Sequence, residues 1–314
     1  MVNRRFLRIK VMQALYGFFQ SEKNDLGKTE KELLANIEKI YDLYIYLFAL
    51  FIDVRHTAYM VIEDAKVKRL PTKEDLAPNT KFIDNSILVG FAENKQIAKE
   101  ISSRKVSWQN DQDIIRKVFG EIRNTEEYKS YMLSDRKSAQ EEKNFLIDIT
   151  RNLIGDHELL NYWFEEKNIH WSDDVYIAVT SLIKTIEAVD TNGNITLMPL
   201  YKDVVEDKQF VCDLLTKCVI HNDAFSELIS DKTKNWEVER IAVMDILLMK
   251  MALTEIMYFE NIPIKVSLNE YIEVSKQYST PKSKLFINGI LDKIVMDLKQ
   301  QNKIVKTGRG LLES

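Results

Sequence analysis

Residues that break helices are scarce in this chain, which has 5 prolines and 9 glycines among 314 residues. Proline lacks the backbone N–H that a helix needs, and glycine loses much conformational freedom in a helix. Both residues are also frequent in turns, so their scarcity disfavours a sheet with many turns. Apolar side chains recur at helical spacing through most of the chain, and the sequence therefore predicts an all-α protein.

The first two predicted helices have clear start signals. Asn3 is a suitable N-cap for a helix over residues 4–20, because its side chain can accept a hydrogen bond from a free backbone N–H. A very long helix is predicted over about residues 29–70, where Thr29 and Glu32 have the spacing of a capping box.

Shorter helices are predicted through the middle of the chain, over about 83–101, 111–119, 126–135, 138–153, 158–166 and 173–189. A final helical block is predicted over 202–301, with breaks near Trp236, Pro263 and Pro281. We expect a flexible tail over 303–314, since chain ends are poorly ordered unless contacts hold them.

The composition is typical of a soluble globular protein, with 45% hydrophobic and 29% charged residues. The longest apolar run, residues 43–52, is half the length of about 20 residues that a membrane-spanning helix requires. Cys212 and Cys218 are six residues apart in a helical segment, on different sides, so we expect two reduced thiols. These features indicate a cytoplasmic protein.

No catalytic or metal-binding pattern is recognisable in the sequence. It contains no glycine-rich phosphate loop and no G-x-S-x-G element. The histidines are scattered without metal-ligand spacing: His56, His157, His170 and His221. We therefore expect neither an enzyme nor a protein that holds a cofactor or metal.

Positive charge is concentrated at the N-terminus, where residues 1–20 contain no acid while the whole chain has a formal net charge of −4. The residues concerned are Arg4, Arg5, Arg8 and Lys10. Like charges at a helix N-terminus are unfavourable, because the helix dipole already makes that end positive. A bound polyanion would relieve this repulsion, and guanidinium groups suit phosphates. The alternative is a solvated basic terminus that binds nothing.

An ordered series of short motifs follows near the C-terminus. It comprises Trp236 before a helix, A-L-T-E-I at 252–256, I-P-I-K-V-S-L-N-E at 262–270 and F-I-N-G-I-L-D-K at 286–293. Together with the N-terminal arginines and Q-A-L-Y at 13–16, this series resembles the NusB family. The resemblance covers about residues 1–22 and 205–300. Gly289 lies inside a predicted helix, so we expect another helix to cross closely there.

The resemblance implies a NusB-like helical bundle with a large helical insertion. The domain boundaries that follow are the first helix in 1–22, the insertion in 23–204, the rest of the bundle in 205–302 and the tail in 303–314. It also implies transcription antitermination on ribosomal RNA operons, through binding of boxA-like single-stranded RNA together with NusE, a small-subunit ribosomal protein. RNA polymerase would be an indirect partner, and the sequence does not decide between a monomer and a homodimer.

Carried over from the family, the RNA-binding residues are Arg4, Arg5, Arg8, Lys10, Gln13, Lys282, Ser283, Lys284 and Phe286. Tyr16 and Glu255 are the corresponding candidates for contact with NusE. Two alternatives stay open. One is a helical scaffold that binds a ribosomal protein and makes no contact with RNA. The other is an accessory domain of an RNA methyltransferase, which the sequence favours less because the resemblance runs nearly to the C-terminus.

Overall fold

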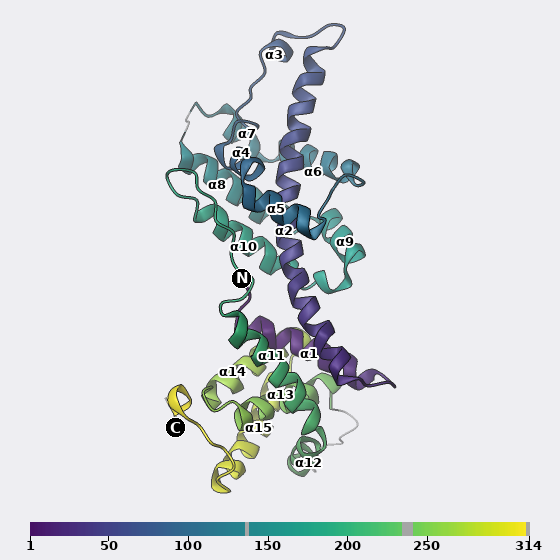
Figure 1. The fold of residues 1–314 in the computed structure, drawn as a ribbon, viewed down its shortest axis with the longest axis vertical. Helices are drawn as coiled ribbons and strands as arrows, with labels where there is room; N and C mark the ends of the chain where they lie inside the picture. The colour runs from purple at the N-terminus through teal and green to yellow at the C-terminus, as the bar shows by residue number, and fades with distance from the viewer. Residues whose placement is uncertain (136–137, 234–240, 312–314) are drawn as a thin grey trace. The chain divides into compact units, whose positions relative to one another are not determined.

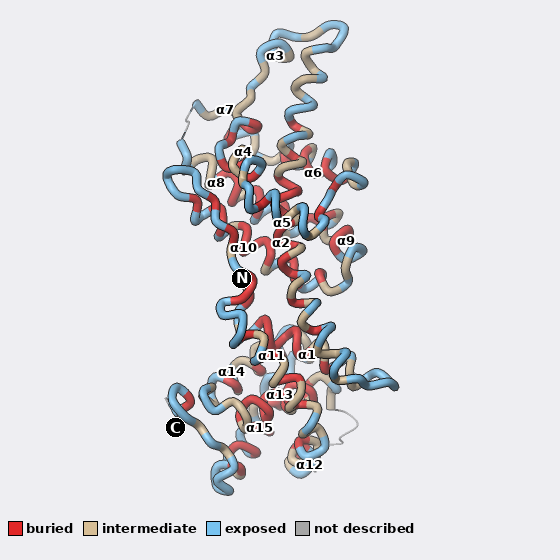
Figure 2. The backbone as a smooth tube through the Cα atoms, viewed as in Figure 1, coloured by how far each residue is buried: buried red, intermediate tan, exposed pale blue. Residues whose placement is uncertain are grey.

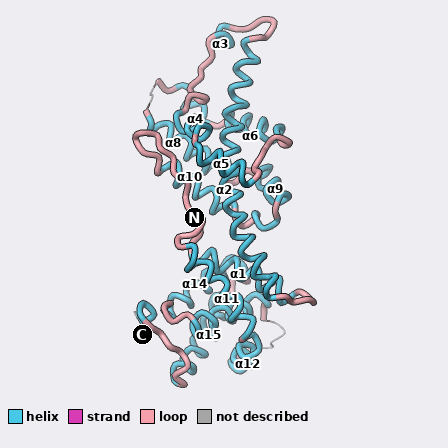
Figure 3. Tube along the Cα trace, in the orientation of Figure 1, coloured by secondary structure: helices cyan, strands magenta, loops and turns pink. Residues whose placement is uncertain are grey.

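The structure, a computed structural model, describes residues 1–135, 138–233 and 241–311. Its regular elements in these ranges are all helical and no strand occurs in them, which confirms the all-α prediction (Figures 1 and 3). Trp236, the tryptophan of the C-terminal motif series, lies outside the described residues.

The chain divides into two compact units. The middle unit consists of Met1 and residues 38–200, and the terminal unit consists of residues 2–37 together with the chain from Tyr201 onward. The helix α2 therefore contributes to both units, whereas the expected boundaries assigned residues 23–37 to the insertion. The expected insertion ended at 204, close to the end of the middle unit at Leu200.

The middle unit contains most of α2 and a series of shorter helices. Their bounds are α2 (Leu26–Lys66), α3 (Lys73–Leu76), α4 (Ser86–Glu93), α5 (Lys95–Arg104), α6 (Gln112–Asn124), α7 (Glu126–Leu133), α8 (Ala139–Ile149), the π-helical turn η1 (Thr150–Ile154), α9 (Glu158–Lys167), the 3₁₀ turn η2 (Ile169–Trp171) and α10 (Val175–Glu187). The predicted helix over 83–101 is two helices, because the Asn94 side chain caps α5 by accepting from the N–H groups of Gln96 and Ile97.

The start of α2 differs from the prediction. The helix begins at Leu26, and the Asp25 carboxylate accepts a hydrogen bond from the Lys28 N–H at 3.0 Å. Thr29 instead donates its hydroxyl to the Asp25 carbonyl at 2.9 Å, so the expected capping box at Thr29 is not formed. Asp25 is an equally good cap residue, and the sequence pattern alone did not distinguish the two.

The core of the middle unit is built around α2. Its side chains from Leu43 to Phe51 are buried almost throughout (Figure 2). The Tyr44 hydroxyl lies 2.5 Å from the Thr185 hydroxyl of α10. By length and composition alone α2 could cross a membrane, but half of its most apolar stretch is buried within the protein. We therefore describe α2 as the core helix of this unit.

The terminal unit is a helical bundle centred on α13. Besides the first part of α2 it contains α1 (Arg4–Gln20), α11 (Val204–Ile220), α12 (Asn222–Lys232), α13 (Val243–Tyr258), α14 (Ile264–Tyr278), α15 (Ser283–Gln300) and the 3₁₀ turn η4 (Gly308–Leu311). The bounds of α1 and its Asn3 cap are confirmed. Residues 247–249 and 251–256 of α13 are buried, as in a helix surrounded by others. The helices packed against it are α1, α11, α12, α14 and α15.

One expectation for this unit is wrong. Gly289 is exposed on α15, and a Cβ atom added there would meet nothing within 4 Å, so no helix crosses closely at this position. The segment from residue 303 to 311, for which the sequence predicted a flexible tail, makes contacts with the bundle. It forms a strap over the α13–α14 loop, in which the Thr307 N–H donates to the Glu260 carbonyl at 3.1 Å.

Glycine is required where this strap lies on the loop. A Cβ atom on Gly310 would lie 2.0 Å from the Glu260 carbonyl oxygen, and Gly308 has a φ of +52°. The Lys306 ammonium donates to the Phe259 carbonyl at 2.8 Å, at the C-terminal end of α13. A cation there satisfies a carbonyl that the helix leaves unpaired. These contacts fix residues 306–310 against the loop.

Candidate nucleic-acid interface

The N-terminus of α1 carries the basic residues that the sequence singled out. The Asn3 side chain accepts a hydrogen bond from the Phe6 N–H at 2.9 Å, which fixes the first turn of the helix. The first turn contains no acid. Arg4 and Arg5 have side chains that are 38% and 46% exposed, whereas that of Arg8 is only 4% exposed. The three arginines therefore occupy different environments.

Arg8 forms a buried ion pair with Glu255 of α13. Its Nε and Nη2 atoms donate to the two carboxylate oxygens at 2.8 and 2.7 Å, in a bidentate arrangement. Glu255 has no exposed surface, and it also accepts hydroxyl hydrogen bonds from Ser267 at 2.7 Å and Tyr271 at 3.2 Å. Burial alone would lower the pKa of Arg8, but the hydrogen bonds and charge of Glu255 raise it above its ordinary value.

Arg5 and Arg4, whose own side chains are more exposed than that of Arg8, also have carboxylate partners. Arg5 donates from Nε and Nη2 to Glu270 of α14 at 2.9 and 2.8 Å. The hydrogen bond from Arg5, with the nearby charge of Arg8, lowers the pKa of Glu270. The Arg4 Nε atom lies 3.0 Å from an oxygen of Asp207 on α11, and its guanidinium carbon lies 4.4 Å from the centre of the Phe210 ring.

These ion pairs correct the electrostatic argument made from the sequence. The repulsion among the arginines does not require a polyanion, because carboxylates from α11, α13 and α14 already neutralise it. The basic cluster is therefore compatible with RNA binding but does not demand it. Among its basic side chains, α1 offers to a ligand the exposed parts of Arg4 and Arg5.

Four of the candidate contact residues have buried side chains. Arg8 is 3% exposed, Lys10 2%, Ser283 1% and Glu255 0%. In this structure none of them presents a side chain to an RNA strand or to a protein partner. Burial therefore argues against direct contact for all four, and for Arg8, Ser283 and Glu255 the hydrogen bonds indicate a positioning role instead.

The second candidate segment is the turn before α15. Ser283 donates its hydroxyl to Asp245 of α13 at 2.8 Å and accepts from the Thr280 N–H at 3.1 Å. The Ser279 hydroxyl donates to the other oxygen of Asp245 at 2.5 Å. The buried Asp245 thus holds both ends of the turn. Lys282 is exposed at the end of this turn, and Lys284 is exposed in the first turn of α15.

The other candidate residues are at least partly accessible. Phe286 on α15 and Gln13 on α1 are half-buried, and Tyr16 on α1 is 44% exposed. Gln13 and Phe286 have protein contacts of their own. The functional role of these three residues stays a prediction.

Both candidate segments are held by α13. Asp245 fixes the turn before α15 and Glu255 fixes Arg8 near the start of α1. Ten residues of α-helix separate the two acids by about 15 Å along the axis. Glu255 and Glu270 occur in the sequence motifs, but the motifs gave no sign of their pairings, since Arg8 and Glu255 are 247 positions apart.

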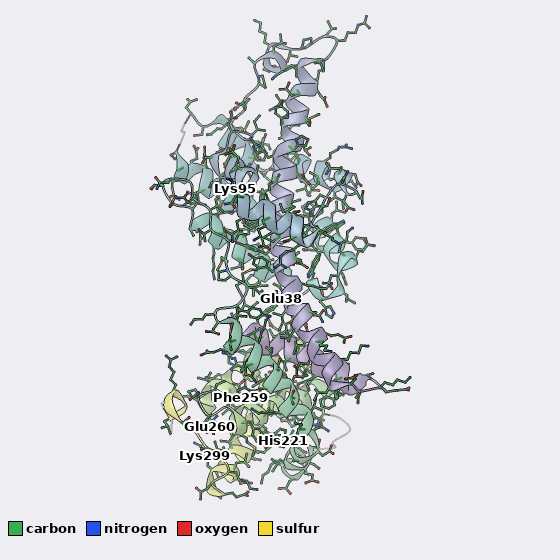
Figure 4. The ribbon with its side chains drawn as sticks, in the orientation of Figure 1. Glu38, Lys95, His221, Phe259, Glu260 and Lys299 are labelled. Carbon is green, nitrogen blue, oxygen red and sulfur yellow. The ribbon has the colours of Figure 1, made fainter. Side chains whose placement is uncertain are left out.

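A groove that the sequence did not predict lies beside the α1 arginines. It has a volume of about 1230 Å³ and is lined by the start of α1, by α11, by the α13–α14 loop, by α14 and by η4. Arg4, Arg5, Phe210, Phe259 and Arg309 are among its lining residues. Phe259 is labelled in Figure 4, beside Glu260 on the same loop.

Comparison with known proteins identifies the C-terminal region. The NusB family matches residues 178–296. Transcription antitermination protein NusB of Salinibacter ruber is 50% identical over 86 residues, which are 27% of this chain and 54% of that protein. The NusB proteins of Chloroherpeton thalassium and Methylacidiphilum infernorum are 38% identical over 115 residues and 39% identical over 92 residues.

These matches are partial on both sides. The Chloroherpeton match covers 36% of this chain and 54% of the relative, and the Methylacidiphilum match covers 29% and 64%. No solved structure matches the chain. The family match starts within α10, inside the expected insertion, and ends near the C-terminus of α15. The part of this chain that matches the NusB family is therefore residues 178–296.

Proposed function

We propose that this protein is a non-catalytic, cytoplasmic RNA-binding factor for transcription antitermination. It binds boxA-like single-stranded RNA together with NusE on ribosomal RNA operons. The NusB-family domain and the names of the relatives support antitermination as the process. The resemblance of the α1 and α15 segments to the family supports RNA as the ligand and NusE as the partner.

The single observation that carries the proposal is the arrangement around α13. Two segments from opposite ends of the chain are anchored on one buried helix, by Glu255 and Asp245. Each segment exposes basic side chains: Arg4 and Arg5 on α1, and Lys282 and Lys284 at the start of α15. Basic side chains supply phosphate contacts, and an accessible aromatic ring can stack on a base.

The proposed roles follow from the burial of each residue. Arg4, Arg5, Lys282 and Lys284 contact phosphates. Gln13 and Phe286 contact bases with their accessible parts, and Tyr16 contacts NusE. Arg8, Ser283 and Glu255 position these segments from the interior of the terminal unit. No cofactor takes part.

The scaffold alternative has one observation in its favour, namely that all three α1 arginines are already paired with carboxylates. In that case the protein would bind NusE but not RNA. The two functions separate in a binding measurement with boxA-like and scrambled RNA, with and without NusE, across a series of salt concentrations.

We expect the boxA-like RNA to bind more tightly than the scrambled RNA and NusE to increase its affinity. Lys282→Gln with Lys284→Gln should weaken RNA binding and reduce the salt dependence, because counterion release falls with each lost phosphate contact. Lys293→Gln on the exposed face of the same helix is the matched control and should have no effect. Intact NusE binding with equal, feeble binding of both RNAs would establish the scaffold function instead.

A further inference from the structure

The groove beside α1 is built entirely from the terminal unit. It lies where α1, α11, the α13–α14 loop and the C-terminal strap meet, and it has a volume of about 1230 Å³. Pockets for small ligands usually have volumes of about 300 to 1000 Å³, so this groove has room for part of a chain molecule. None of the RNA-contact predictions made from the sequence included the strap.

Among the groove arginines, one has no acidic partner in residues 1–135, 138–233 and 241–311. Arg4, Arg5 and Arg8 each form an ion pair with a carboxylate. Arg309 is exposed and forms no ion pair with the described part of the chain. A guanidinium group without an acidic partner is the one whose full charge is available to an incoming anion.

The strap holds Arg309 at the groove. Lys306 is bonded to the Phe259 carbonyl, the Thr307 N–H is bonded to the Glu260 carbonyl, and Gly310 packs directly on Glu260. Phe259 and Glu260 are labelled in Figure 4. The residues on both sides of Arg309 are fixed in the folded protein, so its backbone is already ordered before a ligand binds. Binding therefore does not carry the entropy cost of ordering that backbone.

We propose that Arg309 is an RNA-binding residue, which together with Arg4 and Arg5 holds a phosphodiester of a single-stranded RNA in this groove. This inference rests on the proposed RNA-binding function and extends it to the C-terminal strap. The groove also offers aromatic side chains: Arg4 covers the Phe210 ring, and Phe259 contacts Phe210 edge to face with ring centres 5.4 Å apart. Cationic and aromatic side chains together are characteristic of sites for single-stranded RNA.

One acid in the lining of the groove can be used to distinguish an anionic ligand from a cationic one. Glu206 of α11 lines the groove with a side chain that is 76% exposed, and its carboxylate lies 3.8 Å from Arg4. At this exposure the ion pair adds little to the stability of the fold. Neutralising Glu206 should therefore strengthen the binding of an anionic RNA and weaken the binding of a basic peptide.

The test measures RNA affinity as a function of salt for the full chain and for three single variants. Arg309→Gln should weaken binding about three- to tenfold and reduce the slope of log K against log salt by about 0.7, the value for one phosphate on a single strand. The loss should be similar for boxA-like and scrambled RNA, since phosphates carry no sequence information. Glu206→Gln should bind both RNAs more tightly.

Lys303→Gln is the matched control, because Lys303 is an exposed cation of the same terminal segment that does not line the groove. A loss in Arg309→Gln no larger than in Lys303→Gln overturns the inference, and so does weaker RNA binding by Glu206→Gln. In either case, weakening by Lys282→Gln with Lys284→Gln would leave the proposed function standing. If the unaltered protein binds neither RNA, the proposed function fails as well.

A fourth variant tests the strap without removing a charge. Gly310→Ala places a methyl group 2.0 Å from the Glu260 carbonyl oxygen, so the strap must move away from the loop. We expect a loss of RNA affinity similar to that of Arg309→Gln. Unchanged affinity in Gly310→Ala would mean that the strap does not position Arg309, and would overturn this part of the inference.

Discussion

Replacement of Glu255 should reveal whether Arg8 has a structural or an RNA-binding role. Glu255 is fully buried and accepts two hydrogen bonds from Arg8, one from Ser267 and one from Tyr271. In Glu255→Gln the charge is lost, and Arg8 stays buried with only the more distant Glu270, 3.4 Å from its Nη1 atom, as an acidic partner. Removing one partner of a buried ion pair typically costs about 3 to 5 kcal/mol. We expect a loss of this size in the free energy of unfolding, measured by urea denaturation.

The double variant Arg8→Met with Glu255→Leu should be more stable than either single variant. It removes both charges together, so no unpaired ion stays in the interior. The hydroxyls of Ser267 and Tyr271 then lose their acceptor, at about 1 kcal/mol each. We therefore expect a total loss of about 2 kcal/mol, well below the sum of the two single losses.

RNA binding by the same double variant separates the two roles of Arg8. If Arg8 only positions α1, the stable double variant retains the salt slope of the unaltered protein. If Arg8 contacts a phosphate, the slope falls by about 0.7. A loss below about 1 kcal/mol in Glu255→Gln, or additive losses in the double variant, would refute the structural reasoning itself.

Three further predictions concern the same unit. Asp245→Asn should lower the free energy of unfolding in urea by about 1 to 3 kcal/mol and weaken RNA binding, because the hydroxyl of Ser283 loses a charged acceptor. Unchanged RNA affinity would argue against a role for the turn. Gly289→Ala should stabilise the protein by about 0.5 to 1 kcal/mol, since the added methyl group meets no other atom within 4 Å. The control Gly120→Ala on α6 should do the same for the same reason. A loss of RNA affinity confined to Gly289→Ala would show that RNA approaches α15 at this position. Burial lowers the pKa of Lys306 to about 8 from its ordinary value of 10.5. Between these pH values the unfolded chain binds more protons than the folded protein, so the stability of the protein should rise with pH across that window. The urea midpoint of Lys306→Met should not show this rise.

The sequence predicted those features that depend on neighbouring residues. The start of α1 follows from Asn3 and from the helical pattern behind it, and both are local signals. The end of α1 at Gln20 was also predicted from that pattern. The NusB resemblance rested on short motifs in order, and the family match over residues 178–296 bears it out.

The sequence could not predict which charges meet in space. Arg5 and Glu270 are 265 positions apart, and no periodicity in one sequence links them. The basic N-terminus was therefore interpreted without its counter-ions. The strap was missed for a similar reason, because Gly308 and Gly310 look like a flexible tail until the loop that they cover is known.

The positions of the two acids on α13 have a consequence for the path of an RNA strand. Ten residues correspond to about 1000° of helical rotation, so Asp245 and Glu255 point in directions about 80° apart around the axis. The turn before α15 and the start of α1 are thus held on adjoining sides of one helix, about 15 Å apart along it. Since α13, both segments, the groove and the strap all belong to the terminal unit, that unit contains every contact proposed for the RNA. The middle unit therefore contributes none of the proposed RNA contacts. Substitutions within it should leave the salt slope of RNA binding unchanged.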